Sequence, residues 1–211
     1  MGARLQDGRA VAVSPPCWPT TNSVTIPSGR FSYGDAPVRR SKKSELLEAA
    51  GAIIVRSGVE ALTFDRLAAD AGVSKGGILY HFPDKERLLV ALVEGIVALT
   101  DLAIADAVQS EPEPAQPGRW LRAYIGVAFT NGDEIDRLLG VLIAALPPDS
   151  PALVPLIAAD RRWLEAACAD GLPRGLAIAI RLAVDGAFFT RLDEGDAAAT
   201  RATLLKLTEQ A

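Results

Sequence analysis

Residues 74 to 85 bring together side chains that can donate hydrogen bonds to phosphate oxygens. Ser, Tyr and neutral His donate such bonds, and Lys adds positive charge. Two consecutive glycines let a partner approach the backbone closely, although each glycine costs about 1 kcal/mol in a helix relative to alanine. The residues expected to face outward are Ser74, Lys75, Gly76, Gly77, Tyr80 and His81. This combination predicts contact with the backbone of a nucleic acid.

Two short helices joined by a glycine-containing turn are needed to position these side chains. Thr63 is the predicted N-cap of the first helix and Ser74 that of the second, with Gly72 in the turn between them. Leu67 and Ile78 supply apolar contacts between the two helices. In such a helix-turn-helix, one helix lies across the DNA backbone while the second enters the major groove. Thr63 lies at the start of the first of these helices, and we include it among the residues expected to contact DNA.

Apolar residues recur at helical spacing on both sides of this pair of helices. The segments with this pattern are residues 44–57, 84–108, 118–131, 134–146, 151–170, 173–193 and 196–209. The predicted fold class is all-α, with an N-terminal three-helix helix-turn-helix domain at 41–101 and a C-terminal helical domain at 102–211. Residues 1–36 show neither a helical nor a strand period, so residues 1–40 are predicted to form a disordered extension.

Charge is unevenly distributed along the chain. The 211 residues carry a formal net charge of -4. Residues 37–87 hold nine Lys and Arg against seven Asp and Glu, a local charge of +2, whereas residues 88–211 hold ten against seventeen, a local charge of -7. Because attraction to phosphate falls off within roughly 8 to 10 Å, what matters for DNA binding is which face carries the positive residues.

Cysteine content and hydropathy bear on the compartment. Cys17 and Cys168 are too few for a disulfide framework or a cysteine-based zinc site within one chain. No uninterrupted apolar run reaches the roughly eighteen residues of a membrane-spanning helix. Charged residues and prolines also interrupt the first thirty residues, where a secretory signal needs an apolar stretch. We expect a cytoplasmic protein with no membrane partner.

The run from Thr63 to Leu89 resembles the DNA-binding region of the TetR family of bacterial repressors. The resemblance joins the turn Ala71-Gly-Val-Ser74, the segment Tyr80-His-Phe82 and the following Lys85-Glu-x-Leu-Leu89 in one register. It implies a homodimeric repressor that binds double-stranded operator DNA and is released by a small-molecule effector. The residues that it implies at the DNA are Lys75, Gly76, Gly77, Tyr80 and His81, with Lys85 at a phosphate. Many members have a base-reading side chain where this chain has Gly77, so DNA shape and neighbouring residues must contribute more to specificity here.

The resemblance also implies that the C-terminal domain binds the effector and forms the dimer through its last two helices. An effector pocket would be lined by aromatic residues of this domain, namely Trp120, Tyr124, Phe129, Trp163, Phe188 and Phe189, although aromatics at helical spacing are usually core. Arg181 and Asp185, one turn apart, are expected to form an ion pair, with ligand anchoring as the alternative. Two apolar stripes, one with Ile180 and Val184 on the penultimate helix and one with Ala198, Ala202 and Leu205 on the last, suit a dimer interface or burial within one subunit.

Several residues near the helix-turn-helix have two interpretations. His81 is either a phosphate contact or a core residue, and the basic run from Arg39 to Lys43 is either a DNA-binding arm or a solvated charge run. Leu79 and Phe82 are expected in the core.

An enzyme or small-molecule carrier on a helical scaffold is the competing interpretation of the whole chain. Enzymes of this size normally show a nucleophile with its base, paired carboxylates, a metal set or a phosphate loop. We find none of these patterns in a sequence with one histidine, and we predict no catalytic residue, metal site or cofactor.

Overall fold

The computed structural model describes residues 41–112, 116–129, 134–190 and 192–209, together with four short strands nearer the N-terminus. The strands are β1 (Ala3–Gln6), β2 (Arg9–Ala12), β3 (Thr25–Ile26) and β4 (Gly29–Arg30). β1 pairs antiparallel with β2, and β3 with β4. The other residues of the predicted disordered extension, residues 1–40, lie outside the described residues, and the disorder stays a prediction.

Helices make up the rest of the described secondary structure. In chain order they are α1 (Lys42–Ser57), η1 (Val59–Ala61), α2 (Phe64–Ala71), α3 (Lys75–His81), α4 (Lys85–Ser110), α5 (Arg119–Ala128), α6 (Glu134–Ala145), η2 (Pro151–Leu153), α7 (Val154–Cys168), α8 (Arg174–Thr190) and α9 (Glu194–Glu209). The all-α fold class with an N-terminal helix-turn-helix is confirmed. The predicted helix at 151–170 is a 3₁₀ turn followed by α7, and the short turn η1 was not predicted.

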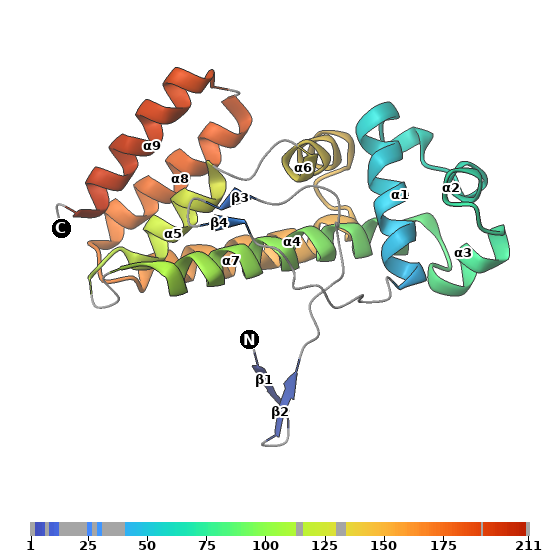
Figure 1. Cartoon of the computed structure of the whole chain (residues 1–211), viewed down its shortest axis with the longest axis horizontal. Helices are drawn as coiled ribbons and strands as arrows, with labels where there is room; N and C mark the ends of the chain where they lie inside the picture. The colour runs from blue at the N-terminus through green and yellow to red at the C-terminus, as the bar shows by residue number, and fades with distance from the viewer. Residues whose placement is uncertain are drawn as a thin grey trace.

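The long helix α4 connects the two ends of the molecule. Figure 1 shows α1, α2 and α3 at one end, α5, α8 and α9 at the other, and α4 running between them. The first half of α4 contributes Leu88 and Leu92 to the apolar core that it shares with α1, α2 and α3. Its second half contributes Ile104 to a separate core with α5, α7, α8 and α9. A displacement of α4 therefore disturbs the packing of both cores.

The sequence of α4 is strongly apolar because the helix packs in both cores. Lys85–Ser110 is long and apolar enough to cross a membrane by length and composition, and half of its most apolar window is buried inside the chain. A helix that lies in two apolar cores has the same composition.

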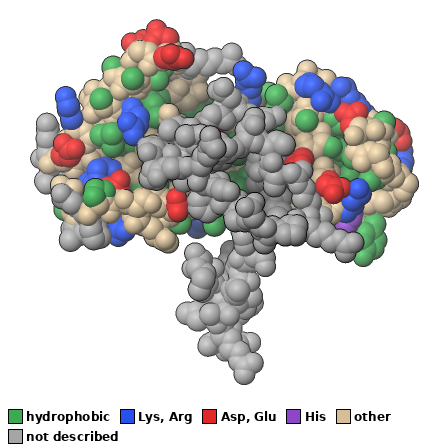
Figure 2. All heavy atoms as spheres, viewed as in Figure 1, with side chains coloured by type: hydrophobic (Ala, Val, Ile, Leu, Met, Phe, Trp, Pro, Cys, Tyr) green, Lys and Arg blue, Asp and Glu red, His purple; other side chains and the backbone are tan. Residues whose placement is uncertain are grey.

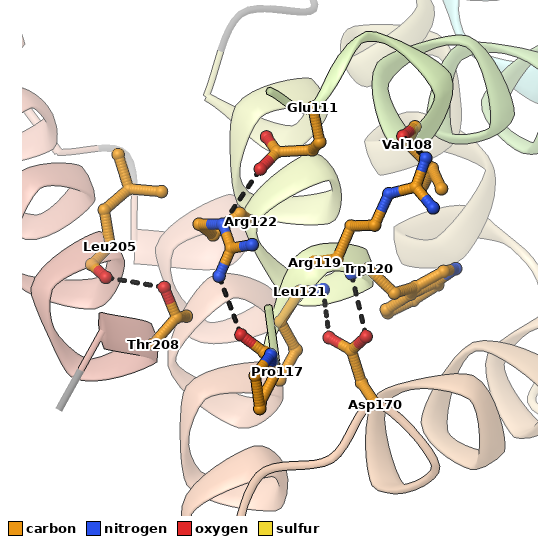
Figure 3. A network of polar contacts seen from close by, with 10 residues as sticks. All are labelled: Val108, Glu111, Pro117, Arg119, Trp120, Leu121, Arg122, Asp170, Leu205 and Thr208. Carbon is orange, nitrogen blue, oxygen red and sulfur yellow. Dashed lines mark hydrogen bonds and ion pairs between the residues drawn. The ribbon is translucent and has the colours of Figure 1, made fainter. Parts of the chain in front are cut away.

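The start of α5 is fixed by the loop that follows α7. Figure 3 shows the Asp170 carboxylate accepting hydrogen bonds from the backbone N–H groups of Trp120 at 3.0 Å and Leu121 at 2.9 Å. The N–H of Gly118 donates to the Asp170 carbonyl oxygen at 2.8 Å. Because Gly118 caps the helix without a side chain, Asp170 supplies the acceptor that an N-cap residue normally provides. This contact sets the orientation of Trp120.

Candidate nucleic-acid interface and ligand cavity

The turn between α2 and α3 is shaped by Gly72. Its backbone adopts the left-handed conformation, with φ of 63°, and its N–H donates to the carbonyl oxygen of Ala68. A residue with a Cβ is strained at this φ, so glycine suits the position. Beyond the turn, the Ser74 hydroxyl accepts a hydrogen bond from the Gly77 N–H at 3.1 Å and caps α3. Leu67 and Ile78, both fully buried, hold the two helices together as predicted.

The opposite face of α3 is open to solvent. Ser74, Lys75, Gly76 and Gly77 are exposed. The Tyr80 side chain is 86% exposed, which is high for a residue with a large aromatic ring. Its hydroxyl is therefore available to an external acceptor.

None of the described residues requires glycine at the two consecutive positions of α3. A Cβ added at Gly76 would come no closer than 3.9 Å to the Ser74 hydroxyl oxygen, and one at Gly77 no closer than 3.5 Å. Both lie in the first turn of α3, and in a helix alanine is favoured over glycine by up to about 1 kcal/mol per residue. Close approach of a partner to the α3 backbone would account for this glycine pair.

The charge of this face is partly balanced within the chain. Lys75 forms an ion pair with Asp65 of α2 at 3.0 Å, and both side chains are more than half exposed. Figure 2 shows acidic as well as basic side chains over the end of the molecule formed by α1 to α3. Exposed ion pairs contribute about 0 to 1 kcal/mol, so Lys75 can exchange Asp65 for a phosphate at little cost. This partner was not predictable from the sequence, because the turn brings together residues that share no helical period.

Three other predicted contacts lie around this face with partners of their own. The Thr63 hydroxyl oxygen accepts a hydrogen bond from the Arg66 N–H at 3.2 Å, which confirms its role as N-cap. His81 is half-buried, with its ring edge-on to Tyr80 at 5.1 Å. Lys85 donates from Nζ to the carbonyl oxygen of Val59 at 2.8 Å and so joins the start of α4 to η1. That intramolecular bond was not predicted, and two of the three ammonium protons remain for another acceptor.

Two expectations about the surroundings of α3 have different outcomes. Phe82 is buried as predicted, whereas the prediction that Leu79 belongs to the core is wrong, because its side chain is 44% exposed. Of the basic run, Arg39 and Arg40 lie outside the described residues. Lys43 lies over the Phe82 ring with its Nζ 5.8 Å from the ring centroid, which holds one cation beside the helix-turn-helix.

In the C-terminal domain, three of the predicted pocket residues lie together. Trp120 stacks on Tyr124 with ring centroids 5.1 Å apart and planes 9° apart, and Trp163 approaches the Tyr124 ring at 6.4 Å. The two tryptophans line an open cavity of about 420 Å³ between α4, α5 and α7. The other four predicted residues do not line it, namely Tyr124, which lies against both tryptophans, and Phe129, Phe188 and Phe189. Phe188 contacts Phe189, which is 64% exposed on α8.

A buried guanidinium lies behind this aromatic group. Arg181 is only 3% exposed and pairs with Asp160 at 2.6 Å and with Asp185 one turn along α8, so the predicted Arg181–Asp185 ion pair is confirmed. Its guanidinium carbon lies 4.6 Å from the Tyr124 ring centroid, and the Tyr124 hydroxyl donates to Asp185 at 3.0 Å. Burial raises the pKa of Tyr124 above 10.0, the nearby Arg181 charge lowers it in part, and Asp160 raises it further.

The predicted apolar stripe of α8 is buried within its own subunit, so it does not form a dimer interface. Ile180 and Val184 are buried in the core of their own subunit. A different face of α8 remains exposed, with Leu182 at 63% and Phe189 at 64% exposure. On α9, Ala198 and Ala202 are also exposed. The free apolar surface of α8 is therefore not the stripe recognised in the sequence.

Two family models match this chain, one for each half. The model described as "Bacterial regulatory proteins, tetR family" matches residues 46–92, which contain α2 and α3. The model described as "Tetracyclin repressor-like, C-terminal domain" matches residues 118–209.

Curated relatives share shorter regions. The HTH-type transcriptional regulator EthR of Mycolicibacterium smegmatis is 28% identical over 112 residues, which cover 53% of this chain and 50% of the relative. The HTH-type transcriptional repressor AcnR of Corynebacterium efficiens is 42% identical over 59 residues, which cover 28% of this chain and 30% of the relative. The chain thus spans half or less of the length of these relatives.

Solved structures show the same fold over most of the chain. A transcriptional regulator from Rhodococcus matches with a TM-score of 0.64 at 18% identity, covering 80% of this chain and 95% of that one. A TetR-family regulator from Agrobacterium tumefaciens matches with a TM-score of 0.56 at 26% identity, covering 80% and 96%. The two family models, one for each half of the chain, and the Agrobacterium structure lead to one conclusion: the chain belongs to the TetR family of bacterial transcriptional regulators.

Proposed function

We propose that this protein is a homodimeric transcriptional repressor that binds double-stranded operator DNA and is released by a small-molecule effector. The observation that carries the proposal is the solvent-exposed face of α3, where Lys75 and Tyr80 flank a glycine pair that the fold itself does not need. These side chains reach phosphate oxygens while the bare backbone enters the major groove. A regulator of this kind acts in the cytoplasm.

DNA binding requires two copies in a fixed arrangement. Two recognition helices enter successive major grooves on one face of the duplex when they lie about 34 to 36 Å apart. The exposed apolar face of α8, with Leu182 and Phe189, is the surface that we assign to the dimer. Burial of these side chains against a second copy removes apolar area from water and so stabilises the pair.

Release by an effector follows from the position of α4. An effector shifts the equilibrium only if it binds better to a conformation in which the α3 helices are wrongly spaced. Such coupling is typically worth about 1 to 3 kcal/mol. The cavity beside Trp120 and Trp163 adjoins the second half of α4, while the first half packs against the helix-turn-helix. A ligand in that cavity can therefore move α4 and, with it, α3.

A binding titration with duplex DNA from the promoter next to the gene tests this function. We expect Lys75→Ala and Tyr80→Ala to weaken binding without loss of helical content, and Lys75→Ala to reduce the salt dependence by about one charge. Arg174→Ala, an equal change of charge at the exposed start of α8, is the matched control and keeps wild-type affinity. Unchanged binding by both α3 variants contradicts the proposal.

A further inference from the structure

The cavity between α4, α5 and α7 has mainly apolar and aromatic walls, and Asp101 and Gln109 of α4 are the polar residues among its described lining. Ile104 and Val108 of α4 form an apolar side, and Trp120 and Trp163 contribute two large aromatic rings. Its volume of about 420 Å³ lies within the range of cavities that hold small organic molecules. The cavity thus offers an apolar molecule two π-faces as well as aliphatic contacts.

Among the described residues that line this cavity, Asp101 of α4 is the one with a charged side chain. One carboxylate oxygen accepts a hydrogen bond from the Trp163 indole N–H at 2.7 Å. The other pairs with Arg162 at 2.9 Å. Arg162 does not line the cavity, and its side chain is 53% exposed, so this ion pair is a weak, solvated one. A carboxylate oxygen has several lone pairs, and Asp101 can accept a further partner from the cavity side.

The aromatic walls are held in place before any ligand arrives. The Asp101 hydrogen bond fixes the indole of Trp163. The Asp170 carboxylate fixes the backbone of Trp120, and Tyr124 stacks against its ring (Figure 3 shows the Asp170 contact). A preorganised site avoids the entropy of ordering these side chains on binding.

We propose that this cavity binds a lipophilic organic cation, such as a quaternary ammonium, a phosphonium or a protonated amine with an apolar body. Aromatic faces attract cations through their quadrupoles, most strongly for Trp. The carboxylate of Asp101 adds the complementary charge, while Ile104 and Val108 contact the apolar body. Residues 88–211, which include all the lining residues, hold a local charge of -7, and this further favours a cation. This inference rests on the proposed function, in which the cavity is the effector site.

Tryptophan emission reports on the cavity directly, because Trp120 and Trp163 form its walls. The third tryptophan, Trp18, lies outside the described residues, and a Trp18→Phe background removes its signal. The probes are tetraphenylphosphonium and tetraphenylborate, which have nearly the same shape and opposite charge. We expect tetraphenylphosphonium to quench the emission saturably and tetraphenylborate to bind at least about tenfold more weakly. Equal binding of the two ions, or saturable quenching by neither, overturns the inference.

Asp101→Asn removes the charge and keeps an oxygen that can accept the Trp163 indole hydrogen bond. We expect this variant to lose affinity for tetraphenylphosphonium by about tenfold while its affinity for tetraphenylborate does not fall. Asp106→Asn, on the same helix but outside the cavity, is the matched control and keeps wild-type affinity. An unchanged affinity of Asp101→Asn for the cation overturns the role of the carboxylate.

Operator binding by the same proteins without any probe separates this inference from the proposed function. If the unliganded protein binds its operator and neither ion binds in the cavity, the proposed ligand class is wrong, whereas the proposed function as a DNA-binding regulator is retained. If operator binding itself is absent, the proposed function fails first.

Discussion

The glycine at position 77 is unfavourable for the helix in which it lies. A Cβ there would meet only the Ser74 hydroxyl oxygen at an ordinary contact distance, so alanine fits the monomer. We expect Gly77→Ala to raise the free energy of unfolding by about 0.5 to 1 kcal/mol and to weaken operator binding, because the added methyl group holds the backbone away from DNA.

Chemical denaturation and a DNA titration on the same preparation measure these two effects. Gly140→Ala on α6, where a Cβ meets no described atom within 4 Å, controls for the gain in helix propensity and keeps DNA affinity. If Gly77→Ala is more stable than the wild type and binds the operator with the same affinity, close approach of DNA does not explain the glycine pair.

At the scale of single residues, the sequence predicted what local chemistry determines. Thr63 and Ser74 are caps because a short hydroxyl side chain before a helix accepts a nearby N–H, and this depends on a few neighbouring residues only. The partners of Lys75 and Lys85 were not predictable, since Asp65 and the Val59 carbonyl reach them only through the tertiary arrangement. Leu79 was assigned to the core wrongly because an apolar side chain on a short helix has no period long enough to place it.

The N-terminus of α5 depends on one carboxylate from a distant loop. We expect Asp170→Ala to lower the free energy of unfolding by roughly 1 to 2 kcal/mol, because two backbone N–H groups lose a charged acceptor at the positive end of the helix. The midpoint of urea denaturation measures the loss. Asp149→Ala, an exposed aspartate in a loop, is the control with little expected change. Equal midpoints for the two variants would show that Asp170 does not cap α5.

The packing of α5 against α8 predicts a pH dependence of stability. Because burial raises the pKa of Tyr124 above 10.0, the folded state keeps the phenol protonated where the unfolded chain ionises it. This stabilisation is fully present below pH 10.0 and is lost as the pH rises through the pKa of the folded state. Tyr124→Phe lacks this contribution and the hydrogen bond to Asp185, so it is less stable than wild type at neutral pH.

The gap in free energy of unfolding between the two proteins should therefore narrow as the pH rises past 10.0. Denaturation curves of both proteins over that range measure it. A gap that is constant with pH would contradict the burial of the phenol.

At the scale of elements, helical periodicity predicted most of the described helices, because each buries one apolar stripe. The contacts between helices were only partly predictable. The Arg181–Asp185 pair lies one turn apart on α8 and was expected, whereas Asp160 comes from α7 and Tyr124 from α5. The same limit applies to the cavity, since spacing predicts an aromatic residue but does not predict which aromatic residues meet.

The whole molecule has an apolar surface that a single subunit leaves in water. Leu182, at 63% exposure, lies on the face of α8 that we assign to the dimer. We expect Leu182→Glu to convert the dimer to a monomer, because a carboxylate cannot be buried unpaired between two copies. Sedimentation velocity over a range of concentrations measures the change, and DNA affinity falls with it.

Val154→Glu, at 58% exposure on α7, replaces an equally exposed apolar residue outside this surface and keeps the dimer. A dimeric Leu182→Glu protein would place the interface elsewhere.

The sequence indicated a dimer only through its family resemblance. The stripe with Ile180 and Val184 was apolar enough for an interface, but burial in its own subunit uses the same residues. Periodicity cannot separate the two cases, since both place apolar side chains on one face of a helix.

Hydroxyl-radical footprinting of the wild-type protein on promoter DNA tests the central claim most directly, namely that two α3 helices enter the major groove together. We predict two protected blocks on one face of the duplex, separated by about one helical turn of 10 base pairs, and loss of both blocks together in Tyr80→Ala. Absence of protection at concentrations where the protein is dimeric, or one protected block that Tyr80→Ala leaves unchanged, would contradict the account.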